Sequence, residues 1–95
     1  MSVPGGDIVA KTVLITNRRG LHARASAKFV TLAATLPCEV KVRKDEGAVT
    51  GTSIMGLMML GAAMGDHITI AASGDGAEQA VGALAELVEA KFGEE

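Results

Sequence analysis

Cys38-Glu39-Val40-Lys41-Val42-Arg43 is the stretch of sequence that decides the fold. Apolar and charged residues alternate along it without a break, which is typical of a β-strand with one buried face and one wet face. Residues 68–72 alternate in the same way, with Ile68 and Ile70 on one side. Strands buried on both faces are apolar almost throughout, so this alternation predicts a mainly antiparallel sheet that is covered on one face only.

The segments on either side of this stretch extend the pattern into a β-α-β-β-α-β-α order. Apolar periodicity predicts strands at residues 8–16, 38–43, 48–50 and 67–72, and helices at residues 23–36, 53–60 and 77–92. Leu14 breaks the alternation of the first strand and is expected to face outward, while Pro37 ends the first helix. Asp75, with Glu78 three residues later, suggests a capping box before the last helix. The order predicts a two-layer α+β domain with a ferredoxin-like or related split βαβ topology.

The composition describes one small domain with an aliphatic core. The chain has 95 residues, of which 48 % are hydrophobic but only 2 % aromatic. A chain of this size buries roughly 60–65 % of its unfolded surface, which is enough for one modestly stable core and leaves no room for a second. We therefore expect a single domain over residues 8–95, preceded by a flexible arm at residues 1–7.

Charge and hydropathy exclude several functional classes. The net charge of −2 and the scarcity of aromatic residues argue against nucleic-acid binding. Residues 54–64 form the longest apolar stretch, far short of the ~20 residues that a membrane span needs, and residues 1–7 lack the features of a signal peptide. The single cysteine, Cys38, permits no internal disulfide and fits a reducing compartment. These features predict a cytoplasmic protein that inserts in no membrane.

The sequence that joins the first strand to the first helix holds the candidate functional group. It reads Asn17-Arg18-Arg19-Gly20-Leu21-His22-Ala23-Arg24-Ala25-Ser26 and places His22 at the expected helix start. A helix N-terminus has unpaired N–H groups and a partial positive charge, so it disfavours an imidazolium and suits an anion. A neutral histidine there is a candidate nucleophile, although a capping or surface role is the commoner interpretation of such a histidine taken alone. Arg24 and Lys28, with the two arginines of the loop, give His22 a basic rim that suits a phosphate or an acidic partner.

Two motifs together give a specific resemblance. Gly20-Leu21-His22-Ala23-Arg24 and Ser53-Ile54-Met55-Gly56-Leu57-Met58 resemble the HPr family, the histidine-containing phosphocarrier proteins of the bacterial phosphoenolpyruvate:sugar phosphotransferase system. The resemblance runs over residues 8–92 and includes the order of elements. It implies an open-faced β-sandwich in which four strands are covered by three helices.

The resemblance also implies roles for three residues. His22 matches the histidine that Enzyme I phosphorylates on Nδ1 at the expense of phosphoenolpyruvate. Arg24 matches the arginine that steadies the phosphoryl group and docks on partners, and Ser53 matches the serine that an ATP-dependent kinase phosphorylates in some members. Without the resemblance, Arg24 is an ordinary solvated arginine and Ser53 an N-cap, and the capping and regulatory roles of Ser53 are compatible.

One residue departs from the family pattern. Members commonly have proline directly after the motif arginine, where this chain has Ala25. Alanine restores a backbone N–H and loses a fixed φ, so we expect a working site with a less rigid helix start. The branch of the family is left open by this residue.

The helix that follows Ser53 is apolar on all sides. Ile54, Leu57, Met58 and Met59 are core residues by default, but so short a helix cannot bury every side chain. We expect Met55 and Met58 to be exposed, because flexible methionines suit a surface that meets several partners. The predicted docking surface consists of Arg24, Lys28, Ile54, Met55 and Met58.

The remaining histidine and the cysteine give no sign of a metal site. Cys38 is expected as a small buried hydrophobe and His67 as a strand-edge residue, and no ligand spacing joins them to His22. We expect neither a metal nor a cofactor.

These observations predict a phosphoryl carrier rather than an enzyme. His22 accepts the group from phospho-Enzyme I and passes it to an Enzyme II A-type protein, and an HPr kinase/phosphorylase regulates the carrier through Ser53. The alternative is a regulatory protein-binding module of a nitrogen-related phosphotransferase branch, whose partner binding depends on its phosphorylation state. A monomer is expected in either case.

Overall fold

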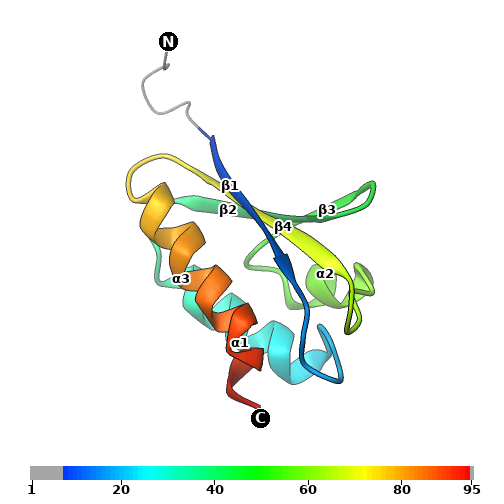
Figure 1. The fold of residues 1–95 in the computed structure, drawn as a ribbon. Coiled ribbons are helices and arrows are strands. Elements are labelled where there is room, and N and C mark those ends of the chain that lie inside the picture. Colours follow the sequence, from blue (N-terminus) through cyan, green and yellow to red (C-terminus); the bar gives the residue numbers. More distant parts are fainter. Residues whose placement is uncertain (1–7, 95) are drawn as a thin grey trace.

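The computed structural model describes residues 8–94, so the arm predicted at residues 1–7 lies outside the described residues. The elements are β1 (Ile8–Leu14), α1 (Ala23–Ala34), β2 (Glu39–Lys44), β3 (Gly47–Thr50), α2 (Ile54–Met59), β4 (His67–Ser73), α3 (Ala77–Glu89) and a short 3-10 turn, η1 (Lys91–Gly93). The helices lie on one side of an open sheet (Figure 1). The predicted α+β class, the order of elements and the two layers are confirmed.

The sheet has the strand order β1-β4-β2-β3, and every neighbouring pair is antiparallel. β4 pairs with β1 on one side and with β2 on the other, so β1 and β2 run parallel with β4 between them. This is the split βαβ arrangement that the sequence predicted. It places Leu14, at the end of β1, opposite His67, at the start of β4, and the loops that extend from this end of the sheet lie side by side.

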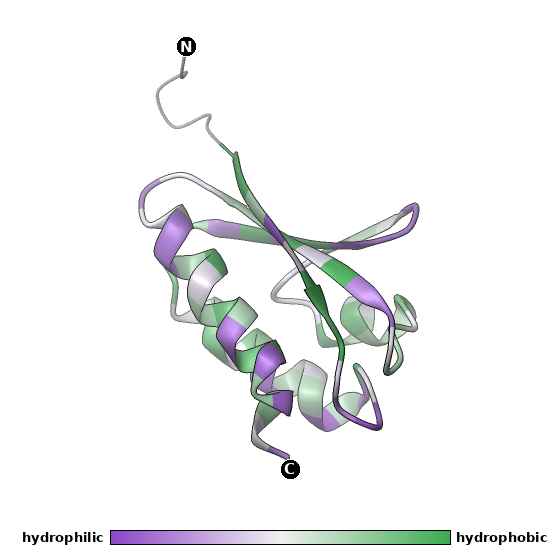
Figure 2. Ribbon diagram, in the orientation of Figure 1, coloured by the Kyte–Doolittle hydropathy of each residue, from purple (hydrophilic) through white to green (hydrophobic). Residues whose placement is uncertain are grey.

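Alternation along the strands decides which face the helices cover. In β2, Val40 and Val42 are buried, whereas Glu39, Lys41 and Arg43 are exposed. In Figure 2 the strands change between hydrophobic and hydrophilic colours along their length, and α1 and α3 pack on one side of them. Burial of one parity of side chains against these helices therefore forms the core, as predicted.

The helices contribute matching apolar stripes. Phe29 of α1 is fully buried, and α3 buries Val81, Leu84 and Val88 while Glu78 and Glu86 remain exposed. A fully buried phenylalanine supplies the largest apolar surface that α1 can bring to an otherwise aliphatic core. The periodicity of both helices was predicted correctly.

Both ends of α3 differ from the prediction. Gly76 is the N-cap, with a φ of +79° and no side-chain capping hydrogen bond, so the capping box of Asp75 and Glu78 is wrong. The helix ends at Glu89 rather than Phe92, because the chain turns through two left-handed residues, Lys91 (φ 58°) and Phe92 (φ 56°). This turn directs the Phe92 ring into the core, where it is buried.

Smaller differences concern single residues. α1 ends at Ala34, since Thr35 takes the C-cap position before Pro37 is reached. Cys38 precedes β2 and is half-buried against the core rather than fully buried. Leu14 faces outward as predicted, and His67 is exposed at the first position of β4, which is an inner strand of the sheet.

None of the helices described over residues 8–94 is long and apolar enough to cross a membrane.

Candidate functional site

The loop between β1 and α1 is shaped by a buried asparagine and a glycine. Asn17 is fully buried, and its Nδ2 donates to the Gly20 carbonyl at 2.9 Å. Gly20 has a φ of +62°, and a Cβ on it would lie 2.3 Å from the carbonyl oxygen of Ala62. Leu21 is buried and donates its backbone N–H to that same oxygen at 3.0 Å. These contacts fix the direction in which the chain enters His22.

His22 is the N-cap of α1. Its backbone is extended (φ −75°, ψ −178°), and its carbonyl accepts the first helical hydrogen bond, from Ser26 N at 2.8 Å. The imidazole Nδ1 accepts from the backbone N–H of Arg24 at 3.2 Å. The prediction that His22 lies at the helix start is confirmed, and Nδ1 is the ring atom that points to the positive end of the helix.

Glu94 occupies the other ring nitrogen. His22 Nε2 lies 2.5 Å from Glu94 Oε2, and both side chains are largely sheltered. A carboxylate only accepts hydrogen bonds, so this contact assigns the proton to Nε2; the Arg24 amide only donates, so Nδ1 keeps its lone pair. Both contacts therefore select the same neutral tautomer, with the proton on Nε2 and the lone pair on Nδ1.

The surroundings of Glu94 keep it anionic. Desolvation alone raises the pKa of the Glu94 carboxyl, but hydrogen bonds from His22 and Asn17, together with the positive charge of Lys28, hold the pKa below its ordinary value. Asn17 Nδ2 donates to Glu94 Oε1 at 3.2 Å. Each carboxylate oxygen thus has its own donor, and the side chain is fixed in orientation.

The turn η1 brings Glu94 to the site. Phe92 anchors the turn in the core, and its carbonyl accepts a hydrogen bond from Lys28 Nζ at 2.7 Å. Lys28, predicted as a docking residue, therefore spends at least one of its three donors on holding this turn against α1. Glu94 follows directly after the turn.

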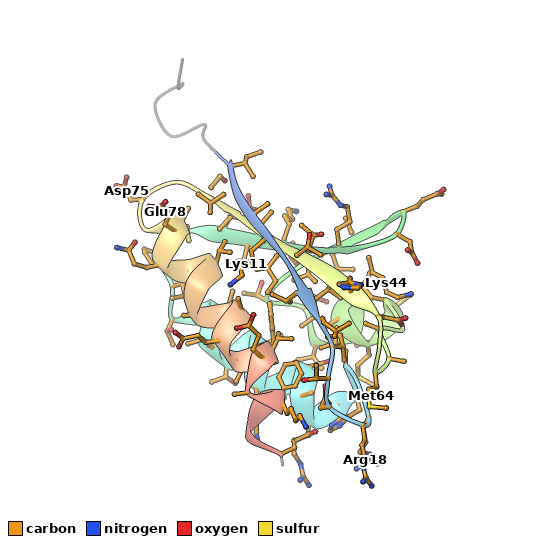
Figure 3. All side chains as sticks on the ribbon, viewed as in Figure 1. Lys11, Arg18, Lys44, Met64, Asp75 and Glu78 are labelled. Atoms are coloured by element: carbon orange, nitrogen blue, oxygen red, sulfur yellow. The ribbon has the colours of Figure 1, made fainter. Side chains whose placement is uncertain are left out.

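Four cations surround this arrangement. Arg18 and Arg19 from the loop, and Arg24 and Lys28 from α1, line an open hollow of about 360 Å³ together with Gly93 and Glu94. Figure 3 shows Arg18 projecting from the loop at this end of the molecule. The four basic residues inferred from the sequence therefore lie around one hollow, and the Glu94 carboxylate lies among them.

Ser53 lies at a second helix start. It is the N-cap of α2, where its Oγ accepts from Gly56 N at 2.9 Å. In the helix that follows, only Leu57 is buried, so the default assignment of Ile54 and Met59 to the core is wrong. A helix of one and a half turns meets the core along a single line of side chains, and the others remain outside it.

The exposed residues of α2 include the predicted docking side chains. Ile54 is 40 % exposed, Met55 73 % and Met58 43 %, and the predicted exposure of both methionines is confirmed. α2 packs against α1, so this apolar surface adjoins the helix that His22 caps. Within residues 8–94, no hydrogen bond joins Ser53 to His22.

Over the part of the chain that the structure describes, no group of three or more histidine, cysteine or carboxylate side chains is arranged to hold a metal ion.

Two site residues were missed by sequence reasoning, Asn17 and Glu94. Asn17 stood in the quoted loop but resembled any turn asparagine. Glu94 was one of several glutamates near the end of the sequence, and 72 positions separate it from His22. Only the fold shows that the two meet.

Comparison with known proteins shows the family of the chain. The family model described as the PTS HPr component phosphorylation site matches residues 9–90. This chain belongs to the HPr family. Members of the HPr family are phosphocarriers of the phosphotransferase system, not enzymes, and carry the phosphoryl group as a phosphohistidine intermediate. Glu94 lies beyond the residues that the family model matches.

Similar proteins cover nearly the whole chain. The phosphocarrier protein HPr of Pseudomonas aeruginosa is 44 % identical over 86 residues, which are 90 % of this chain and 96 % of that protein. The phosphocarrier protein NPr of Escherichia coli K12 is 38 % identical over 88 residues, 92 % of this chain and 98 % of that protein. The crystal structure of HPr-C-His from Thermoanaerobacter tengcongensis superposes with a TM-score of 0.87 at 44 % identity, covering 92 % and 98 % of the two chains. The open-faced α+β fold is therefore shared with solved HPr structures.

Proposed function

We propose that this phosphocarrier accepts its phosphoryl group on Nδ1 of His22 from phospho-Enzyme I, ultimately from phosphoenolpyruvate, and passes it to an Enzyme II A-type protein. The observation that carries the proposal is the pair of hydrogen bonds on the ring, since Nε2–H donates to the Glu94 carboxylate and the Arg24 amide donates to the Nδ1 lone pair. The helix N-terminus that disfavours a charged imidazole also favours the phosphoryl dianion that Nδ1 receives. The same environment promotes the nucleophile and stabilises the product.

The test is a transfer reaction followed by mapping. The protein is mixed with phosphoenolpyruvate, Mg²⁺ and an Enzyme I of the phosphotransferase system, and its intact mass is measured. One acid-labile phosphoryl group, assigned to Nδ1 of His22 by NMR, supports the proposal. The absence of an adduct, or an adduct on another residue, contradicts it.

Arg24 is proposed to steady the transferring phosphoryl group. We expect Arg24→Ala to lower the rate of phosphoryl acceptance roughly 10- to 100-fold, because a hydrogen bond to a charged group is worth about 1.5–3 kcal/mol. Arg24→Lys keeps the charge but loses the planar fork of donors, so its rate should fall between those of Arg24→Ala and the wild type. Rapid-quench measurement of transfer from phospho-Enzyme I gives these rates.

Arg43 provides the matched control for Arg24. It is an exposed arginine on β2, and it lies on the face of the sheet that the helices do not cover. Arg43→Ala should transfer at the wild-type rate. An equal loss in the Arg24 and Arg43 variants would reduce the role of Arg24 to a contribution to overall charge.

Ser53 is proposed as a regulatory site for an ATP-dependent kinase of the HPr kinase/phosphorylase type. A negative charge at this helix start is tolerated by the helix but lies beside the exposed apolar surface of α2, where it would repel an acidic Enzyme I surface. Ser53→Asp is therefore expected to lower the rate of phosphoryl acceptance about tenfold, mainly through weaker association. The Michaelis constant for the carrier in the Enzyme I reaction measures this effect.

Ser53→Asn separates charge from capping. Asparagine caps a helix about as well as serine or aspartate but carries no charge. We expect it to behave like the wild type in both melting temperature and Michaelis constant. If Ser53→Asp and Ser53→Asn gave the same Michaelis constant, the electrostatic switch would be excluded.

The second candidate function is a regulatory protein-binding module of the nitrogen-related branch. It is supported by the relative named NPr, which matches as much of this chain as the relatives named HPr do. Both candidates use phospho-His22, and they differ in the partner that reads it. Phosphoryl transfer to an Enzyme II A-type protein of a sugar branch is compared with transfer to one of the nitrogen-related branch. Transfer to the first and not to the second favours the carrier of the first proposal.

The place and assembly of the protein follow from the same proposal. We expect it to act in the cytoplasm, where Enzyme I and phosphoenolpyruvate meet and where the half-buried Cys38 remains reduced. His22, Arg24, Asn17 and Glu94 all come from one chain, so a monomer suffices for the site.

A further inference from the structure

The contact between Glu94 and His22 has a consequence for the phosphorylated protein. We propose that Glu94 is a positioning residue that keeps the proton on His22 Nε2 in both the free and the phosphorylated carrier, and so makes phospho-His22 a competent phosphoryl donor. The inference rests on the proposed function, because it concerns the fate of a phosphoryl group on Nδ1.

Glu94 is held firmly enough for this role. Its Oε2 accepts a hydrogen bond from Nε2–H, with Nε2 and Oε2 2.5 Å apart, and its Oε1 accepts one at 3.2 Å from Nδ2 of Asn17, which is itself fully buried. The side chains of His22 and Glu94 are 19 % and 16 % exposed, so water screens their interaction only in part. An amide that is locked in the core thus orients the carboxylate against the ring.

The backbone before Glu94 is constrained as well. Lys91 and Phe92 are consecutive non-glycine residues with positive φ, an arrangement that costs free energy and persists only where the surroundings enforce it. The surroundings here are the buried Phe92 ring and the Lys28 ammonium on the Phe92 carbonyl. Besides burying Phe92, the strained turn places the Glu94 carboxylate at Nε2.

The chemistry of the carrier needs this proton. When the Nδ1 lone pair forms the N–P bond, the donor keeps the electrons of the bond that breaks, and the ring becomes a cation that still carries hydrogen on Nε2. When the N–P bond breaks in the next transfer, its electron pair returns to Nδ1 and the neutral Nε2–H tautomer is restored. No proton moves in either step. If Nε2 had lost its proton, the leaving group would be an imidazolate, which departs far less readily.

Glu94 is the carboxylate in contact with the ring, and the other charged groups around it are cations. They are Arg18 and Arg19 from the β1–α1 loop and Arg24 and Lys28 from α1, which line the hollow together with Glu94. The cations favour the phosphoryl dianion on Nδ1 but oppose a proton on Nε2. The Glu94 carboxylate lies at Nε2, on the opposite edge of the ring from Nδ1, and its negative charge favours a proton there.

The test compares acceptance with donation in Glu94→Gln. Glutamine can still accept a hydrogen bond from Nε2–H but carries no charge, so we expect acceptance from phospho-Enzyme I to fall less than donation does. Donation is measured as return of the phosphoryl group to Enzyme I, with pyruvate as the final acceptor, from neutral to alkaline pH. The pH at which the return rate falls to half should move down by about one unit in Glu94→Gln, since an opposite charge in contact shifts a titration by that order.

Three further measurements keep the test decisive. The ¹⁵N signal of Nε2 in phospho-His22 should titrate with the same displacement as the return rate. Glu86→Gln removes an exposed carboxylate from α3 and should leave both profiles unchanged. Glu94→Asp, which keeps the charge on a shorter side chain, should lie between Glu94→Gln and the wild type.

The outcomes separate the two proposals. Coinciding profiles for the wild type and Glu94→Gln would overturn the role of Glu94 while leaving His22 as the acceptor. A wild-type protein that takes no phosphoryl group on His22 would instead overturn the proposed function.

Discussion

Replacement of His22 with asparagine is expected to abolish the phosphoryl adduct completely, whereas replacement of His67 with alanine leaves it intact. These are the two histidines of the chain, and their structural surroundings differ. His22 caps α1 with Nδ1 on the Arg24 amide, while His67 is exposed at the start of β4 opposite Leu14. Only His22 has a helix N-terminus to receive the phosphoryl dianion.

Asparagine is the informative replacement at position 22. It is among the best N-cap residues, so its side chain can satisfy an amide at the start of α1 and the domain should remain folded. Loss of the adduct can then be assigned to loss of the nucleophile, provided that circular dichroism and melting temperature stay near those of the wild type. An adduct that survives in His22→Asn, or disappears in His67→Ala, would contradict the assignment of the acceptor.

The parts of the fold that were predicted correctly depend on local periodicity. Val40 and Val42 are buried because their strand alternates, and the same rule gives the buried residues of β4. His22 was placed at a helix start because an apolar stripe begins at Ala25. In each case the neighbours in sequence are also the neighbours that decide the structure.

The parts that could not be predicted depend on contacts between distant segments. Glu94 reaches His22 because a turn after α3 adopts positive φ at Lys91 and Phe92, and the burial of Phe92 enforces that turn. Nothing in the local sequence favours such φ values at lysine or phenylalanine. Gly76 replaced the expected capping box for a related reason, since a Cβ there would lie 3.2 Å from the ring of Pro37, which is far away in sequence.

Gly20→Ala is expected to destabilise the domain by about 2–5 kcal/mol and to impair phosphoryl acceptance. An alanine with the left-handed φ of Gly20 costs about 1–2 kcal/mol, and its Cβ would lie 2.3 Å from the Ala62 carbonyl oxygen. That oxygen accepts the Leu21 N–H, so relief of the clash requires this buried hydrogen bond to break, at a further cost of about 1–3 kcal/mol. For a domain of this size, thermal unfolding should occur about 10 °C lower or more.

Gly61→Ala distinguishes the clash from the backbone strain. Gly61 has a φ of +67°, but no atom lies within 4 Å of the position that its Cβ would take. Its replacement should therefore cost only about 1 kcal/mol, and phosphoryl acceptance should persist. The difference between the two variants measures the close approach of the two loops, because both residues have nearly the same φ. Equal stabilities would mean that the 15–22 loop shifts away from Ala62 at little cost. His22 would then depend on its own helix, rather than on the neighbouring loop, for its position.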